Sequence, residues 1–111
     1  MAYQILIVDD HKIFRDGIKS ILEKREEFKV VGEADNGAEA VQACKRLKPE
    51  LVLMDIGLPG LNGIEATVEI MRHCPDCKVV ILSMYDDESS VVGAIRSGAR
   101  AFVLKNASSD D

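Results

Sequence analysis

Acidic side chains follow two apolar runs of the sequence. Asp9 and Asp10 follow ILIV at 5–8, and Asp55 follows LVLM at 51–54. If both runs are strands of one parallel sheet, their carboxyl ends lie at the same edge, and the three carboxylates gather there. Carboxylates held close together repel one another unless a cation lies between them. Mg²⁺ prefers oxygen ligands of this kind, so the sequence predicts a Mg²⁺ site at that edge.

Two further polar groups are expected at the same edge. Ser83 ends the run KVVILS at 78–83, and Lys105 ends RAFVLK at 100–105. A carboxylate beside a divalent cation can attack phosphorus and form an aspartyl phosphate. The Ser83 hydroxyl and the Lys105 ammonium group would then neutralise the transferring oxygens. Each residue alone more often serves as a helix cap, turn residue or surface lysine, so the prediction rests on their convergence.

The elements that must position these groups alternate regularly along the chain. Apolar runs predict strands at 4–8, 29–34, 51–54, 78–83 and 100–105. Amphipathic spacing predicts helices at 12–25, at 37–47 with Asp35 or Asn36 as its cap, from 62–63 onward, and at 88–97 with Gly98 after it. This alternation is typical of the α/β class, with a parallel sheet covered by helices on both faces.

Length and charge limit the alternatives. The chain has 111 residues, enough for one domain, and a net charge of −5 without a Lys/Arg cluster. Duplex nucleic acid is therefore a poor direct partner for this segment. The apolar run at 5–8 meets two acids at once, which argues against a signal peptide or a membrane span and favours a cytoplasmic location.

The cysteines and histidines are expected to be structural. Three cysteines do not suit a disulfide framework, and CPDC at 74–77 lacks the second pair that a zinc site needs. Cys44 lies at the spacing of an apolar helix face, so it should belong to the core. His11 and His73 have no partner at ligand spacing in the sequence and are interpreted as surface residues.

The end of the sequence suggests a missing element. NASSDD at 106–111 is typical of a helix N-cap with acids in the first turn, yet no helix follows. We therefore expect that the chain, as one domain over 1–111, is cut before a fifth helix. Loss of that helix should expose apolar sheet surface unless a neighbouring chain covers it.

Four segments together resemble a known family. They are ILIVDDHKIFRDGI, LVLMDIGLPGLNGIE, VVILSMYDDE and GARAFVLKNASSDD. Over nearly the whole chain the sequence is similar to the receiver domain of bacterial two-component response regulators, and most similar to the NarL/FixJ type. The resemblance implies a flavodoxin-like, doubly wound sheet of five strands in the order 2-1-3-4-5.

The resemblance also implies roles for the acidic residues. Asp55 would accept a phosphoryl group from the phosphohistidine of a sensor histidine kinase. Asp10 and Asp55 would bind Mg²⁺ directly, together with the backbone carbonyl of Gly57, while Asp9 would act largely through water. Mn²⁺ could replace Mg²⁺ as the cofactor.

Further roles concern the switch between two states. Ser83 and Lys105 would hold the phosphoryl oxygens, and Phe102 stands at the position of a switch aromatic. Phosphorylation would draw Ser83 inward and let Phe102 turn toward the vacated space. Met84 would narrow access to the phosphoryl group, and Tyr85 would shield it from water.

The family resemblance implies partners as well. The chain would catalyse its own phosphorylation and dephosphorylation at Asp55 without being a conventional enzyme. It would form a homodimer on phosphorylation, and it would reach DNA only through a helix-turn-helix domain beyond residue 111, with no membrane partner.

Other functions remain open from the sequence. A stand-alone phospho-switch acting through protein contacts, or one that has lost its phosphorylation, would keep the same fold. A haloacid-dehalogenase-type phosphatase is disfavoured because Gly57 stands where a second acid is needed, and a flavin binder because DDHKIF at 9–14 is acidic.

Overall fold

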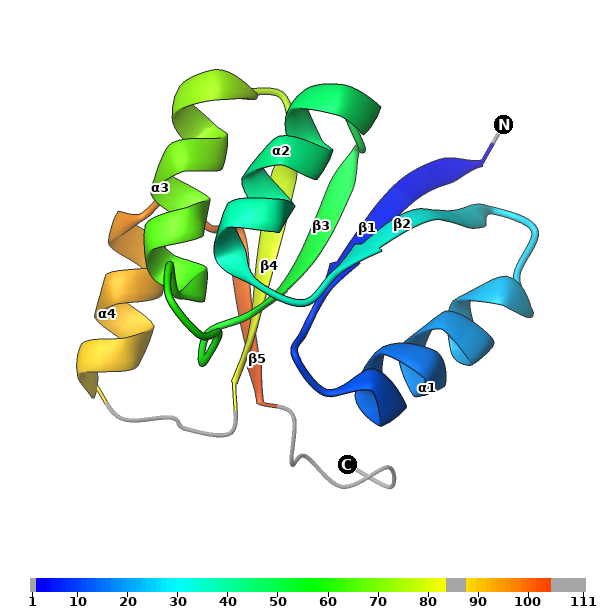
Figure 1. Ribbon diagram of the computed structural model, residues 1–111, viewed down its shortest axis with the longest axis horizontal. Coiled ribbons are helices and arrows are strands. Elements are labelled where there is room, and N and C mark those ends of the chain that lie inside the picture. Colours follow the sequence, from blue (N-terminus) through cyan, green and yellow to red (C-terminus); the bar gives the residue numbers. More distant parts are fainter. Residues whose placement is uncertain (1, 84–87, 105–111) are drawn as a thin grey trace.

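The fold is a five-stranded parallel sheet between two helical layers (Figure 1). The computed structural model describes residues 2–83 and 88–104. The strands run in the order β2-β1-β3-β4-β5, which confirms the expected flavodoxin-like topology. In chain order the elements are β1 Tyr3–Val8, α1 Lys12–Glu23, β2 Phe28–Ala34, α2 Gly37–Leu47, β3 Leu51–Asp55, α3 Gly63–His73, β4 Lys78–Ser83, α4 Glu88–Arg96 and β5 Ala101–Leu104.

One face of the sheet carries the main core. Helices α2, α3 and α4 lie on this side (Figure 1). Alternate strand residues pack there against small and apolar helix residues, among them Val52 and Met54 of β3 and Ala66 and Ile70 of α3, all with no exposed surface. Residues 5–8 of β1 are buried on both faces of the sheet, and this part of the strand reads as a continuous apolar run without polar alternation.

Helix α1 lies on the opposite face, next to β1 and β2 (Figure 1). Ile5 and Ile7 of β1 are fully buried, whereas Leu53 of β3 is half-buried and Val103 of β5 is 46% exposed. Burial on this face therefore falls from the first strand toward the fifth. Exposed apolar surface on the sheet was expected from the sequence, and the described residues show it here.

Helix ends follow the predicted capping signals. Asn36, one of two expected caps, accepts a hydrogen bond from the backbone of Glu39 and begins α2. Asn62 and Glu65 form a reciprocal capping box at the start of α3. Gly98 has a φ of 105°, the left-handed conformation expected after α4.

Helix α1 is shorter than predicted. It ends at Glu23 rather than at residue 25, because Lys24 and Arg25 donate to the carbonyls three residues earlier, at Ile21 and Leu22. Bonds of this kind belong to a tighter, 3₁₀-type turn, so the α-helix ends before them. With 12 residues α1 is the longest of the described helices, and within residues 2–83 and 88–104 no helix has the length and apolarity to cross a membrane.

Candidate metal and phosphoryl-transfer site

Strand register brings the acidic residues together. Val8 of β1 pairs with Met54 of β3, so Asp9 and Asp55 come next on neighbouring strands at the same edge of the sheet. Asp9 has no exposed surface, Asp55 is 5% exposed, and the side chain of Asp10 is 33% exposed. One ligand atom from each of these three carboxylates lies within 4.8 Å of the others. The predicted convergence of the acids is therefore confirmed.

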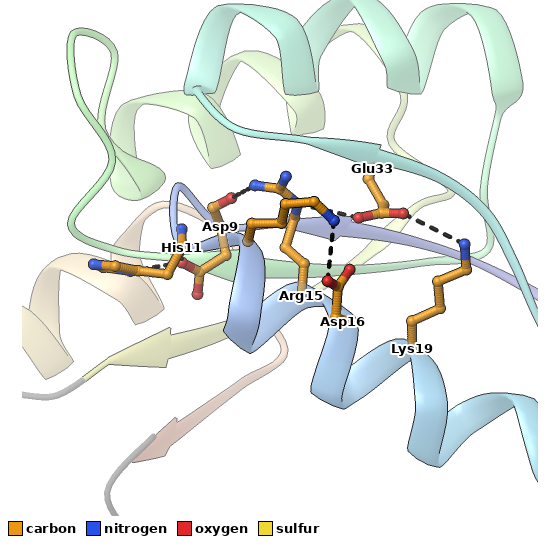
Figure 2. Close-up of polar contacts among 7 residues, drawn as sticks. Asp9, His11, Arg15, Asp16, Lys19 and Glu33 are labelled. Atoms are coloured by element: carbon orange, nitrogen blue, oxygen red, sulfur yellow. Dashed lines mark hydrogen bonds and ion pairs between the residues drawn. The ribbon is translucent and has the colours of Figure 1, made fainter.

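The backbone around Asp9 is held at several points. Its N–H donates to the carbonyl of Ala34 at 3.0 Å, which extends the pairing of β1 with β2. Its Oδ1 accepts the backbone N–H of His11 at 2.8 Å, an Asx turn that leads the chain into α1. Its carbonyl oxygen accepts a hydrogen bond from the guanidinium of Arg15 (Figure 2). These bonds fix the buried carboxylate at the strand end.

Arg15 belongs to a network that the sequence did not reveal. Its Nε lies 3.1 Å from Oε1 of Glu33 on β2, and Lys19 lies 3.6 Å from the other oxygen of that carboxylate (Figure 2). The side chain of Arg15 is only 15% exposed. Arg15 thus joins the acidic loop to the edge strand and places a cation beside the acids. Only the mixture of charges in α1 hinted at this role.

His11 is the clearest correction to the sequence interpretation. It is exposed, as expected, but the statement that it has no partner at ligand spacing is wrong. Its Nδ1 lies 2.9 Å from Oδ1 of Asp9 and 3.2 Å from Oδ1 of Asp10. It is grouped with Asp9, Asp10 and Asp55 in the one cluster of at least three potential metal ligands found among the described residues. His73, in contrast, contacts only Glu69 at 3.6 Å, among the pairs described.

The loop after Asp55 is fixed by its neighbours. The N–H of Gly57 points to Oδ1 of Asp55 at 3.4 Å, and the N–H of Ile56 donates to the carbonyl of Leu82 at 3.0 Å. Gly63, at the start of α3, lies so close to this loop that an added Cβ would meet the Asp55 carbonyl. Gly57 is therefore near the acids, while ligation by its carbonyl remains a prediction.

Ser83 and Phe102 occupy the strand positions expected for them. Asp55 pairs with Leu82, so Ser83 lies one residue further along β4 at the same edge, fully buried. Phe102 on β5 pairs with Ile81 and packs, half-buried, against the main core. Three other predicted site residues, Lys105, Met84 and Tyr85, lie outside the described residues.

The donor set decides which ion fits. Asp9 and Asp10 follow β1 and Asp55 ends β3, and all three supply hard carboxylate oxygens. Asp9 and Asp55 are buried, whereas Asp10 is partly open to solvent. Mg²⁺ is usually held by one or two carboxylates and keeps several waters, which the exposed side of the cluster permits. The residues therefore fit Mg²⁺.

The cysteines lie away from this site. Residues 48–50 and 73–77, which include Cys74 and Cys77, line a cleft of about 300 Å³. This cleft lies at the end of the sheet where β4 begins. Cys44 is fully buried, as expected for a core residue, and burial raises the pKa of its thiol to about 12. Burial also raises the pKa of Cys77, whose Sγ donates to the Pro49 carbonyl at 3.0 Å. High pKa values disfavour thiolate chemistry.

Comparison with known proteins identifies the family. Residues 5–111 match the model of the response regulator receiver domain. The chain is 43% identical over 107 residues to the transcriptional regulatory protein DegU of Brevibacillus brevis, covering 96% of this chain and 45% of DegU. The chain thus spans about half the length of the curated relatives it matches.

Solved structures agree with this match. A LuxR-family two-component response regulator from an Aurantimonas species superposes with a TM-score of 0.91 at 34% identity, covering 96% of this chain and 76% of that one. The CheX–CheY–BeF3–Mg²⁺ complex from Borrelia burgdorferi gives a TM-score of 0.88 at 28% identity, with coverages of 96% and 80%.

Proposed function

This chain belongs to the response regulator receiver domain family, with relatives of the NarL/FixJ type, and from that premise we propose that Asp55 is its phosphoryl acceptor. The observation that carries the proposal is the gathering of Asp9, Asp10 and Asp55 within 4.8 Å at one edge of the sheet. A match to the family alone would not require this chain to keep the full acidic set.

The burial and position of Asp55 suit a nucleophile. Its carboxylate ends β3, is almost fully buried, and is oriented in part by the N–H of Gly57. An Asp55 oxygen would attack the phosphorus of a phosphohistidine, and the P–N bond would break with its electron pair returning to the imidazole. The loop held by Ile56 and Gly63 keeps the attacking carboxylate in place.

The other cluster residues would hold the cation. Asp10 and Asp55 would bind Mg²⁺ together with the Gly57 carbonyl, and Asp9 would act largely through water. When bound, Mg²⁺ would offset the charge of the acids and of the transferring phosphoryl oxygens. Ser83 ends β4 at the same edge of the sheet and would donate to one of those oxygens, and Lys105 would neutralise another.

The proposal extends to the longer protein of which this chain would be a part. A sensor histidine kinase would supply the phosphoryl group in the cytoplasm. The phosphorylated state would form a homodimer and change transcription through a DNA-binding domain. The printed names of DegU and of the LuxR-family structure describe transcriptional or two-component regulators, which supports this output.

Labelling of this chain by a small phosphodonor tests the acceptor. Acetyl phosphate with Mg²⁺ should add one phosphoryl group to the wild-type chain, which intact-mass spectrometry detects. Asp55→Asn should abolish this addition, because an amide oxygen is too weak a nucleophile to replace the carboxylate. Asp76→Asn is the matched control. Asp76 is an exposed acid just before β4, at the opposite end of the strand from Ser83 and the acidic cluster.

Chelation separates the metal from the acceptor. EDTA should stop labelling of the wild-type chain, and added Mg²⁺ should restore it. Full labelling of Asp55→Asn would show that another residue is the nucleophile. A labelling rate indifferent to EDTA would remove the metal from the mechanism while leaving Asp55 in place.

A further inference from the structure

We propose that His11 is a ligand for borderline transition-metal ions at the acidic cluster, so that this site binds Zn²⁺ and Co²⁺ through nitrogen and oxygen but Mg²⁺ through oxygen alone. The inference rests on the proposed function, because it concerns the metal taken by the same site. It adds one residue, His11, to a set of ligands that otherwise consists of oxygen atoms.

The position of the imidazole supports direct ligation. Its Nδ1 is 2.9 Å from Oδ1 of Asp9 and 3.2 Å from Oδ1 of Asp10. Two neighbouring donors that each lie about 2.1 Å from one ion are about 3.0 Å apart in octahedral coordination and about 3.4 Å apart in tetrahedral coordination. The distances from Nδ1 to the two carboxylate oxygens therefore fall in the range expected for neighbouring ligands of one ion. Asp55 belongs to the same cluster, in which Asp9, Asp10, His11 and Asp55 each offer one ligand atom within 4.8 Å of the others.

The backbone places this side chain in the cluster. The N–H of His11 donates to Oδ1 of Asp9 at 2.8 Å, and His11 is the N-cap residue of α1. Its carbonyl accepts the N–H of Arg15, the first hydrogen bond of that helix. The imidazole is thus held beside the carboxylates by bonds that do not involve the ring itself.

The His11 side chain is accessible to a metal ion. The side chain of His11 is 68% exposed, so its ring can adjust by small rotations and the site is open to an ion from solvent. Nδ1 lies 2.9 Å from Oδ1 of Asp9, within hydrogen-bond distance. In the neutral tautomer with its proton on Nε2, Nδ1 carries a lone pair that can bind an ion.

The chemistry of the donor atoms separates the metals. Mg²⁺ is a hard ion that takes oxygen ligands and water, so an imidazole adds little to its binding. Zn²⁺ and Co²⁺ are bound well by imidazole, and affinity at such sites rises along the first-row series. Replacing the imidazole should therefore weaken the binding of Zn²⁺ and Co²⁺ much more than that of Mg²⁺.

Calorimetric titration of the wild-type chain and His11→Asn with Co²⁺, Zn²⁺ and Mg²⁺ tests the inference. Asn keeps a polar side chain and a good N-cap but offers an amide oxygen in place of nitrogen. His11→Asn should lower the affinity for Co²⁺ and Zn²⁺ at least about tenfold, since even outer-shell partners of a metal ligand contribute that much. The ratio of Co²⁺ to Mg²⁺ affinity should fall by a similar factor.

The visible absorption of bound Co²⁺ gives a readout that a merely structural role would not change. The bands of the wild-type complex should shift in His11→Asn toward those of an all-oxygen site. His73→Asn is the matched control, because it removes the other of the two histidines, which lies at the end of α3. That variant should keep the wild-type affinities and spectrum.

Two results would overturn the inference. One is a His11→Asn variant with wild-type Co²⁺ affinity and spectrum. The other is an equal loss of Mg²⁺ and Co²⁺ affinity, which would make His11 a support for Asp9 rather than a ligand. Selective Co²⁺ binding through His11 in a chain that fails to bind Mg²⁺ would support this inference and contradict the proposed use of Mg²⁺.

Discussion

Asp9 keeps a carboxylate at a position with no exposure to solvent. A buried charge is costly unless hydrogen bonds or opposite charges compensate for it. Here the backbone N–H of His11 donates to the carboxylate, and the guanidinium of Arg15 bonds the carbonyl of the same residue. Arg15 is itself balanced by Glu33. We therefore regard Arg15 as a positioning residue for the acidic loop.

Cys44 offers a pH-dependent test at the residue scale. Burial, followed by the nearby Cys77 and Cys74, raises the pKa of its thiol from 9.0 to about 12. Between these values the unfolded chain loses the proton and the folded chain keeps it. The free energy of unfolding should therefore fall as pH rises from 9 toward 12, by up to about 1.4 kcal/mol per pH unit for this group.

Cys44→Ala should make this fall shallower. The variant will be less stable near neutral pH because it leaves a small cavity, but its slope against pH is the quantity of interest. Urea unfolding at several alkaline pH values measures that slope. Cys74→Ala, at a half-buried position, is the control and should keep most of the wild-type slope, because burial is the largest cause of the raised Cys44 pKa. Identical slopes for wild type and Cys44→Ala would contradict the prediction.

At the scale of elements, two glycines let helices approach the site closely. A Cβ on Gly63, at the start of α3, would lie 2.7 Å from Cα of Ile56 and closer still to the Asp55 carbonyl. A Cβ on Gly37, at the start of α2, would meet the carbonyl of Leu61. The loop that carries Asp55 is thus packed between the first turns of two helices. The N–H of Gly63 also donates to the carbonyl of Ile56 at 3.1 Å, which joins α3 directly to this loop.

Gly63→Ala should disturb both stability and the site. The added methyl group meets backbone atoms that cannot rotate away, so the variant should lose about 1–3 kcal/mol of unfolding free energy. Labelling of Asp55 by acetyl phosphate should also slow, because the loop must shift. Chemical unfolding and intact-mass spectrometry measure the two effects.

Gly17→Ala is the matched substitution on α1. A Cβ there would meet nothing within 4 Å. Since alanine favours a helix over glycine, this variant should gain about 0.5–1 kcal/mol and keep the wild-type labelling rate. Equal effects of the two substitutions would show that packing against the Asp55 loop is unimportant.

The same elements show how far the sequence could be interpreted. The strands and helices were predictable because apolar runs and capping residues such as Asn62 are local patterns in the sequence. The strand order and the meeting of Asp9 with Asp55 followed from these elements together with the resemblance to a family. The contacts of Arg15 with Glu33 and of His11 with the acids were not. They depend on how α1 lies beside β2 and on the turn at Asp9, which no local pattern encodes.

At the scale of the whole molecule, the charge of the acidic cluster opposes the stability of the folded state. The chain has a net charge of −5, and three carboxylates, one of them with no exposed surface, gather at one edge of the sheet. Arg15 lies beside this edge, but it is paired with Glu33. In the absence of a bound cation, repulsion between the acids therefore lowers the stability of the folded state. An ion that binds only the folded chain should raise that stability by mass action.

Asp10→Asn separates these two effects. Without divalent ions the variant should melt at a higher temperature than the wild type, because one of the repelling charges is gone. With Mg²⁺ at a hundred times its dissociation constant, the wild type should gain about 2.7 kcal/mol, or roughly 10 °C for a domain of this size. Asp10→Asn should lose most of that gain.

Asp16→Asn, which removes an exposed acid paired with Lys12 on α1, should behave as the wild type in both conditions. Calorimetric melting with EDTA and with Mg²⁺ measures all three proteins, and an Asp10→Asn variant that gains as much from Mg²⁺ as the wild type would exclude Asp10 from the metal site.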